Sequence, residues 1–150
     1  MKLISLTQPW ASLVMVGLKR FETRSWDTAY RGDIAIHATK GPVDEMALQQ
    51  IRLTLPEVAQ LSMPRGAVLA VVKLISCDEM TQAMVWSADD RELAVGDWQP
   101  GRFALELADL RPLAIPLPIS MGSRGRPITV HAEIEAQIRS LLQRSSAPGR

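Results

Sequence analysis

The sequence predicts an α+β domain built on a small barrel of about five to six short strands with interspersed helices. Short runs of strand-like alternation, bounded by Gly and Pro, recur along the chain between segments of helical periodicity. The near-continuous apolar run Gly66–Ser76 indicates a central, buried strand. A length of 150 residues suits one hydrophobic core. We therefore expect a single domain over residues 1–144 and a disordered tail over 145–150.

The first quarter of the chain predicts a strand, a short helix and two more strands. Leu3–Leu6 is a short strand, and Pro9 stands in the first turn of a helix that Gly17 ends. Lys19–Arg24 alternates in the strand manner, which puts Glu22 and Arg24 on one face and Thr23 on the other. The next strand is Asp33–Ala38, with His37 on the face of Ala35.

The rest of the chain predicts helices at amphipathic stretches and extended segments between them. Met46 is expected on the apolar stripe of its helix together with Ile51 and Leu55. The prolines after residue 111 favour extended backbone over a helix. In order, we expect a helix over Pro42–Leu55, a helix start in Ser87–Leu93, a strand over Gly101–Leu107, an extended segment Pro112–Pro118 and a last amphipathic helix over Val130–Arg144.

Composition limits the partners of the chain. Hydrophobic residues make up 47% and charged residues 22%, which is ordinary for a globular protein, and the formal net charge is +1. No global field attracts nucleic acid, so any basic surface must be local, which favours a small or single-stranded ligand. No apolar run reaches the roughly 18 residues of a membrane helix. Met1–Leu6 is too short for a signal peptide, and we expect a cytoplasmic protein.

Metal and cofactor chemistry finds no support in the sequence. The two histidines and the single cysteine, Cys77, are far apart and give no metal-ligand spacing. There is no glycine-rich phosphate loop and no Gly-x-Ser-x-Gly elbow. We expect no metal and no cofactor.

The segment from Gln8 to His37 is the predicted functional centre, together with a later turn. Aromatic and charged residues interleave there, and Trp26 and Trp98 stand in polar loops although tryptophan usually packs in apolar runs. Aromatic faces stack on bases, while Arg and Lys bind phosphate or base-edge acceptors. We therefore expect a pocket for a nucleobase-containing ligand, with binding residues Arg24, Trp26, Tyr30, Arg31, His37, Trp98 and Arg102.

Structural roles compete with these assignments. Trp10 is more simply a core anchor, Glu22 and Arg24 can form a strand ion pair, and His37 can be a hydrogen-bonded structural histidine. Trp98 can cover a barrel end. Met121–Arg126 is basic and glycine-bearing, so it is either a surface turn or a segment that touches a phosphate.

Several segments together carry a resemblance to a known family: Ser5–Leu13, Gly17-x-Lys19-x-x-Glu22-x-Arg24-Ser25-Trp26, Tyr30–Gly32 and Ile34–Ala38. They resemble the ASCH domain family, and Gly96–Ala104 is similar to a later signature of that family. The resemblance spans residues 3 to 119. It implies a PUA-like fold, a small β-barrel flanked by helices, to which the last predicted helix is an addition.

The resemblance implies two kinds of function. ASCH domains have been proposed as RNA-binding modules, and some small members are amidohydrolases that remove the acyl group from N4-acylcytidine with a lysine, a threonine and a glutamate. Lys19 matches the lysine, whereas Glu22 stands where the threonine is expected and Thr23 is one residue further on. The nucleophile is then expected to be water.

A hydrolytic mechanism follows from this match. Lys19 acts as a base or stabilises the oxyanion, Glu22 orients it and passes a proton to the leaving amine, and Arg24 holds that carboxylate. Asp97 is the expected second acid, ahead of Glu92, and Thr23 is a weaker candidate. We expect a pyrimidine nucleoside or RNA as ligand. The alternatives are a non-catalytic RNA-binding module and a partner-binding regulatory domain that docks through the last helix. The sequence leaves the oligomeric state open.

Overall fold

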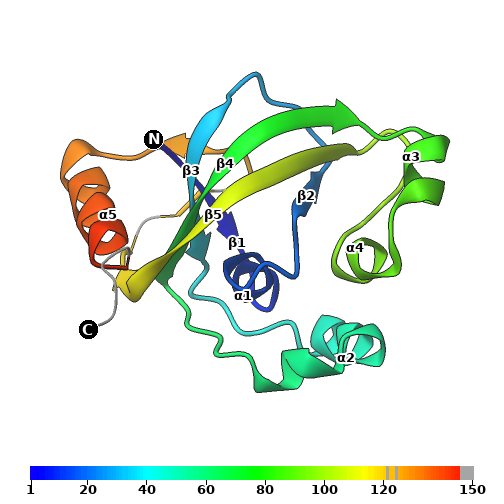
Figure 1. Cartoon of the computed structure of the whole chain (residues 1–150), viewed down its shortest axis with the longest axis horizontal. Coiled ribbons are helices and arrows are strands. Elements are labelled where there is room, and N and C mark those ends of the chain that lie inside the picture. Colours follow the sequence, from blue (N-terminus) through cyan, green and yellow to red (C-terminus); the bar gives the residue numbers. More distant parts are fainter. Residues whose placement is uncertain (121, 124, 146–150) are drawn as a thin grey trace.

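A computed structural model describes residues 1–120, 122–123 and 125–145. Within these residues, six strands form one mixed sheet in the order β2-β5-β4-β3-β1-β6. The sheet curves into a half-barrel around α1 (Figure 1). The elements are β1 (Lys2–Leu6), α1 (Trp10–Met15), β2 (Phe21–Arg24), β3 (Gly32–Ala38), α2 (Glu45–Thr54), the 3-10 turn η1 (Pro56–Gln60), β4 (Ala67–Glu79), α3 (Gln82–Ser87), α4 (Asp90–Val95), β5 (Phe103–Pro118), β6 (Ile128–Thr129) and α5 (Ala132–Ser145).

The two faces of the sheet carry separate cores because side chains alternate along each strand. On the inner face, Ile4, Leu6 and Ile36 pack with Ala11 and Val14 of α1. The outer face packs against α5 at the left of Figure 1, and the buried residues of that core are Leu3, Ala35, Val68, Val71, Leu113, Val130, Ile138 and Leu141. The sheet is therefore buried between helices on both sides, which confirms the predicted α+β fold with an added last helix.

The central strand of the sheet is β4, as its apolar run predicts. It pairs antiparallel with β3 on one side and with β5 on the other. Residues 67–72 are all buried, so this strand needs apolar side chains on both faces. Strand β1 pairs parallel with β3 and antiparallel with the short β6.

The segment after Gly101 differs from its prediction, since a single strand replaces a strand, a turn and an extended piece. Asp109 has a φ of 50°, and the register between β4 and β5 shifts at several points, so the predicted turn is an irregularity within β5. Strand β2 pairs only with Phe103–Glu106, which leaves the far half of β5 with one neighbour. Prolines are tolerated there because the free edge needs no N–H donors.

Three other local predictions need correction. Met46 is 81% exposed, and Leu48 and Ile51 form the buried face of α2 instead. The predicted helix start near Ser87 lies slightly later, where the Asp89 side chain accepts a hydrogen bond from the Glu92 N–H and caps α4. Helix α3 and strand β6 were not predicted. Helix α5 includes Ser145, and the rest of the predicted tail, 146–150, lies outside the described residues.

Candidate functional site

A cleft of about 340 Å³ opens between the start of α1, strand β2 and the turn that follows α4. These segments are far apart in the sequence, and the long strands β4 and β5 carry the α3–α4 segment to the end of the sheet near β2 (Figure 1). The residues that line the cleft are Ser5, Leu6, Thr7, Trp10, Lys19, Glu22, Thr23, Arg24, Val95, Gly96, Asp97 and Arg102.

Lys19 is the most deeply buried charged side chain of the cleft, with 2% exposure. The backbone N–H groups of Leu18 and Lys19 both donate to the Leu13 carbonyl, which folds the segment after α1 back against the helix end. Gly17, with a φ of +80°, makes that reversal possible. The Lys19 Nζ donates a hydrogen bond of 2.6 Å to the Val95 carbonyl. Burial lowers the pKa of Lys19 below its ordinary value, and the nearby carboxylates of Glu22 and Glu92 oppose this shift.

Glu22 connects the lysine to an arginine. Its Oε1 lies 4.0 Å from the Lys19 Nζ and accepts a hydrogen bond from the Thr23 N–H, and its Oε2 lies 3.7 Å from the Arg24 guanidinium. Arg24 also donates to the Ser5 carbonyl at the end of β1. The predicted pairing of Glu22 with Arg24 on one face of the strand is present, and both residues line the cleft. A carboxylate held between two cations in a cleft can orient a lysine or a water molecule.

The turn after α4 closes the other side of the cleft. Thr23 Oγ1 accepts a hydrogen bond from the Asp97 N–H, and Arg102 donates to the carbonyls of Thr23 and Asp97. Arg102 also lies 3.3 Å from the Asp97 carboxylate. Thr23 thus lines the cleft although alternation placed it opposite Glu22, and its hydroxyl fixes the turn. The structure brings the two predicted segments together here.

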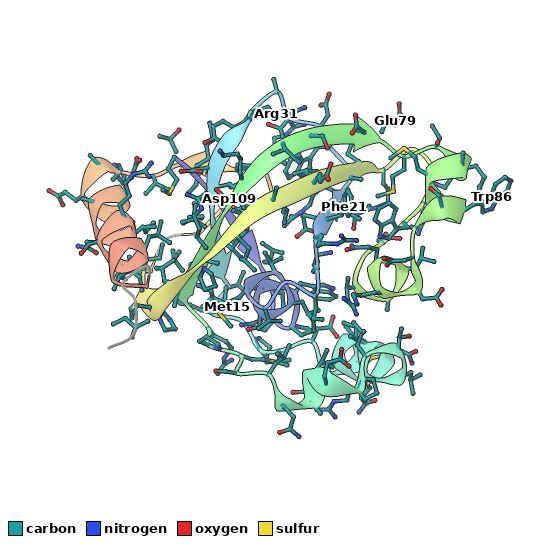
Figure 2. The ribbon with its side chains drawn as sticks, in the orientation of Figure 1. Met15, Phe21, Arg31, Glu79, Trp86 and Asp109 are labelled. Carbon is teal, nitrogen blue, oxygen red and sulfur yellow. The ribbon has the colours of Figure 1, made fainter. Side chains whose placement is uncertain are left out.

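Glu92 and Trp98 lie behind this turn and do not line the cleft. Glu92 is 3% exposed; its Oε1 accepts from Arg20, and its Oε2 makes no hydrogen bond with the described residues. The Trp98 Nε1 donates to the Glu92 carbonyl, and its ring meets Phe21 edge to face. Phe21 is labelled in Figure 2, on the part of β2 near α4. Trp98 therefore packs the turn, which agrees with its structural alternative, and its predicted role as a binding residue is not supported.

Four other predicted binding residues also do not line the cleft. Trp26 packs against the inner core, Tyr30 donates to the Asp33 carbonyl, and Arg31 donates to carbonyls of its own loop. Arg31 projects from the turn before β3 (Figure 2). His37 is buried, with Nδ1 2.8 Å from the Ser5 Oγ, on the outer face of the sheet. Adjacency in sequence suggested these residues, but the strands and the loop turn them elsewhere.

The aromatic side chain that does line the cleft is Trp10. It also packs against two of the cores, so its expected role as an anchor holds as well. Its partial exposure at the start of a short helix is the property that sequence reasoning missed. The Val95 carbonyl, which accepts from Lys19, was also missed because backbone acceptors leave no signal in a sequence. Among the described residues, no cluster of His, Cys, Asp and Glu side chains is arranged to hold a metal ion.

A half-barrel around one helix, with a lysine-bearing cleft beside the edge strand, defines a PUA-like domain. The sequence profile of the ASCH domain matches residues 4–113, so the chain belongs to the ASCH domain family. This family has a PUA-like fold and includes RNA-binding and hydrolase members. The described residues contain no helix with the length and apolar character needed to cross a bilayer.

Two longer proteins are similar to part of this chain. Over 80 residues it is 35% identical to Activating signal cointegrator 1 from Homo sapiens, and the match covers 49% of this chain and 14% of that protein. The protein of the same name from Mus musculus gives the same identity and coverage. The chain thus corresponds to a small part of these relatives.

Solved structures agree with the fold over nearly the whole chain. The ASCH protein from Zymomonas mobilis is 19% identical and superposes with a TM-score of 0.61, over 93% of this chain and 94% of that one. A tyrosine-to-phenylalanine variant of that protein is 17% identical with a TM-score of 0.62, over 93% and 96%. At this identity the likeness shows the fold alone.

Proposed function

We propose that this domain is an amidohydrolase that removes the acyl group from N4-acylated cytosine nucleosides. The observation that carries the proposal is the environment of Lys19, which is 2% exposed at a cleft of nucleoside size and lies 4.0 Å from Glu22. Burying a charged lysine costs free energy, and an ionisable group with a perturbed pKa in a cleft is a candidate for a reactive site. The family includes hydrolases, which supports this class of function.

In the proposed reaction, water is the nucleophile. Uncharged Lys19 donates one N–H to the Val95 carbonyl and directs its lone pair at water in the cleft. It takes a proton as the water oxygen forms a bond to the acyl carbon, which gives a tetrahedral intermediate. The bond from this carbon to N4 then breaks, and the proton passes through Glu22 to the leaving amine. The products are the carboxylic acid and the cytosine nucleoside.

The cleft residues around Lys19 supply orientation. Arg24 and the Thr23 N–H hold the Glu22 carboxylate by its two oxygens. Trp10 provides an aromatic surface against which a pyrimidine ring can pack. Asp97 is 52% exposed and paired with Arg102, while Glu92 is buried, has one oxygen without a hydrogen bond to the described residues, and raises the pKa of Lys19. We therefore propose Glu92 ahead of Asp97 as the second acid, which reverses the order expected from the sequence.

The test is the release of cytidine from N4-acetylcytidine by the purified protein, followed by chromatography. We expect turnover in the wild type and a loss of about 100-fold or more in Lys19→Ala, since a positioned base contributes at least that much. Arg139→Ala removes a cation from the exposed side of α5 and should leave turnover unchanged. Absence of turnover in the wild type, or full turnover in Lys19→Ala, would reject the proposal.

The second candidate is RNA binding without catalysis. It is favoured by the two arginines, Arg24 and Arg102, that line the cleft, since guanidinium groups recognise phosphates and base edges. Affinity for single-stranded RNA that falls steeply with salt, without any nucleoside turnover, would select this function over the hydrolase.

A further inference from the structure

The described residues between β5 and β6 (119–120, 122–123 and 125–127), here called the strap, are attached to β1 at Ser5. The Ser5 N–H donates to the Ser123 Oγ, and the Ser123 N–H donates to the Ser5 Oγ, at 2.9 Å and 2.8 Å. Gly122 lies so close that an added Cβ would stand 2.9 Å from the Ser5 Oγ and 3.3 Å from the His37 ring. These contacts fix the described part of the strap to the sheet.

Beyond this attachment, the strap carries Arg126 to the loop that follows β2. The Arg126 guanidinium donates to the Asp27 carbonyl at 2.8 Å and lies over the Trp26 ring, 5.4 Å from its centroid. The Arg24 guanidinium lies over the same ring at 5.7 Å. Residues from two distant parts of the sequence therefore form one group, the Arg24–Trp26–Arg126 rim.

The two arginines of the rim differ in how their charge is balanced. Arg24 lies 3.7 Å from the Glu22 carboxylate. Arg126 is exposed, and within the described part of the chain no carboxylate lies within 4.0 Å of it. Its contacts with a neutral carbonyl and an aromatic face hold it in place and leave its charge and most of its N–H donors available. A fixed, uncompensated guanidinium beside a second one is the arrangement that binds phosphate.

The rim adjoins the cleft because Arg24 belongs to both. We infer that the Arg24–Trp26–Arg126 rim binds a phosphate group of the ligand, and that the ligand is a cytosine nucleotide whose base occupies the cleft. This inference rests on the proposed function for the identity of the base. It adds that a phosphate ester on the ribose is recognised, either in a free nucleotide or within a strand.

Equilibrium binding tests the rim without any turnover. We would titrate the protein with cytidine, cytidine 5′-monophosphate, cytidine 3′-monophosphate and inorganic phosphate by calorimetry. At least one monophosphate should bind about tenfold more tightly than cytidine, the worth of one charge-assisted contact. Arg126→Ala should abolish this preference and Arg126→Lys should retain part of it. Arg52→Ala, which removes an exposed cation from α2, should leave it intact.

A strand is distinguished from a free nucleotide by an oligocytidylate. If the ligand is a strand, the oligocytidylate binds more tightly than the monophosphates do. Arg126→Ala then reduces the slope of log K for the oligocytidylate against log salt concentration by about one. Equal affinity of the wild type for cytidine and both monophosphates would overturn the inference that the rim binds phosphate. A preference for a monophosphate that persists in Arg126→Ala would overturn it as well. Phosphate binding that depends on Arg126, found in a protein without amidohydrolase turnover, would support the rim and reject the proposed function alone.

Discussion

Two buried polar clusters on opposite sides of the sheet have opposite designs. At the cleft, Lys19 and Glu22 are ionisable groups that are almost fully buried, and Glu92 is a third one, buried behind the adjoining turn; their pairing is loose. The closest approach of Lys19 to Glu22 is 4.0 Å, and one oxygen of Glu92 has no hydrogen bond with the described residues. On the outer face, Ser5 and Ser123 exchange short hydrogen bonds and Ser5 also pairs with His37.

Burial favours a neutral outer cluster. The Ser5 Oγ accepts a hydrogen bond from the Ser123 N–H and forms another with the His37 Nδ1. The His37 Nε2 is buried and makes no hydrogen bond with the described residues. Burial lowers the pKa of His37, so the neutral ring is favoured. The cleft cluster thus keeps ionisable groups loosely paired, whereas the outer cluster joins two backbone segments.

The largest expected effect is a loss of kcat when the cleft cluster is disrupted at Glu22. Glu22→Gln keeps the size of the side chain but removes the carboxylate that, in the proposed mechanism, passes the proton to the leaving amine. We expect kcat for N4-acetylcytidine to fall by about 100-fold, with a small change in thermal unfolding. Asp97→Asn is the matched variant of an exposed carboxylate and should reduce kcat much less. Equal losses in the two variants would contradict the distinction between them.

The next largest effect is a loss of stability, measured as the free energy of unfolding, when the outer cluster is disrupted at Ser123. Ser123→Ala removes the acceptor of the Ser5 N–H in a partly buried place. Leaving such a donor unpaired costs about 1–3 kcal/mol in the free energy of unfolding. Ser120→Ala, an exposed serine of the same strap, is the control and should change it little. Chemical denaturation measures both, and equal stability of the two variants would show that the strap is not fastened through Ser123.

Local motifs of the site were predictable from the sequence, and long-range ones were not. Lys19, Glu22 and Arg24 are close in the sequence and stay close in the structure, because the end of α1 and the adjoining strand β2 hold them. Their association with Asp97 and Arg102 was expected only from the residue types of a later turn and from a family signature, because the contacts span 74 and 79 positions. Tyr30, Arg31 and His37 follow closely in sequence, yet the loop and the alternation of β3 turn them away from the cleft.

Long-range pairing also explains what the fold prediction missed. The contact between Ser5 and Ser123 spans 118 positions and joins a strand to a segment with no regular pattern. The break expected at Asp109 is an irregularity within a strand, because pairing with β4 continues beyond it and compensates for the local turn signal. For Trp10 the sequence favoured a core anchor over a stacking surface, since periodicity reports a buried face and not the part left open at a cleft.

A smaller effect concerns the response of the outer cluster to acid. Since burial lowers the pKa of His37 in the folded protein, the unfolded chain binds a proton near pH 6.5 before the folded one does. This contribution to stability is complete above that pH and is lost as the pH falls below it. A backbone hydrogen bond with Ile119 opposes this lowering of the pKa, and the charge of Lys40 adds to it.

The measurement is the free energy of unfolding between pH 7 and pH 5, in the wild type, His37→Asn and His131→Asn. His37→Asn offers Ser5 an amide oxygen as acceptor and should show a shallower loss of stability on acidification. His131 is exposed, so its variant should follow the wild type. If the free energy of unfolding depends on pH in the same way in all three proteins, the pKa of His37 is not lowered in the folded state.

The pH dependence of kcat/KM for N4-acetylcytidine tests the role of Lys19 most directly. A base with a lowered pKa predicts a rate that rises with pH and levels off below pH 10.5, the ordinary lysine value. Because Glu22 raises this pKa, the residual activity of Glu22→Gln should level off at lower pH than that of the wild type. A rate that does not rise with pH, or a Glu22→Gln profile displaced to higher pH, would contradict the assignment of Lys19 as the base.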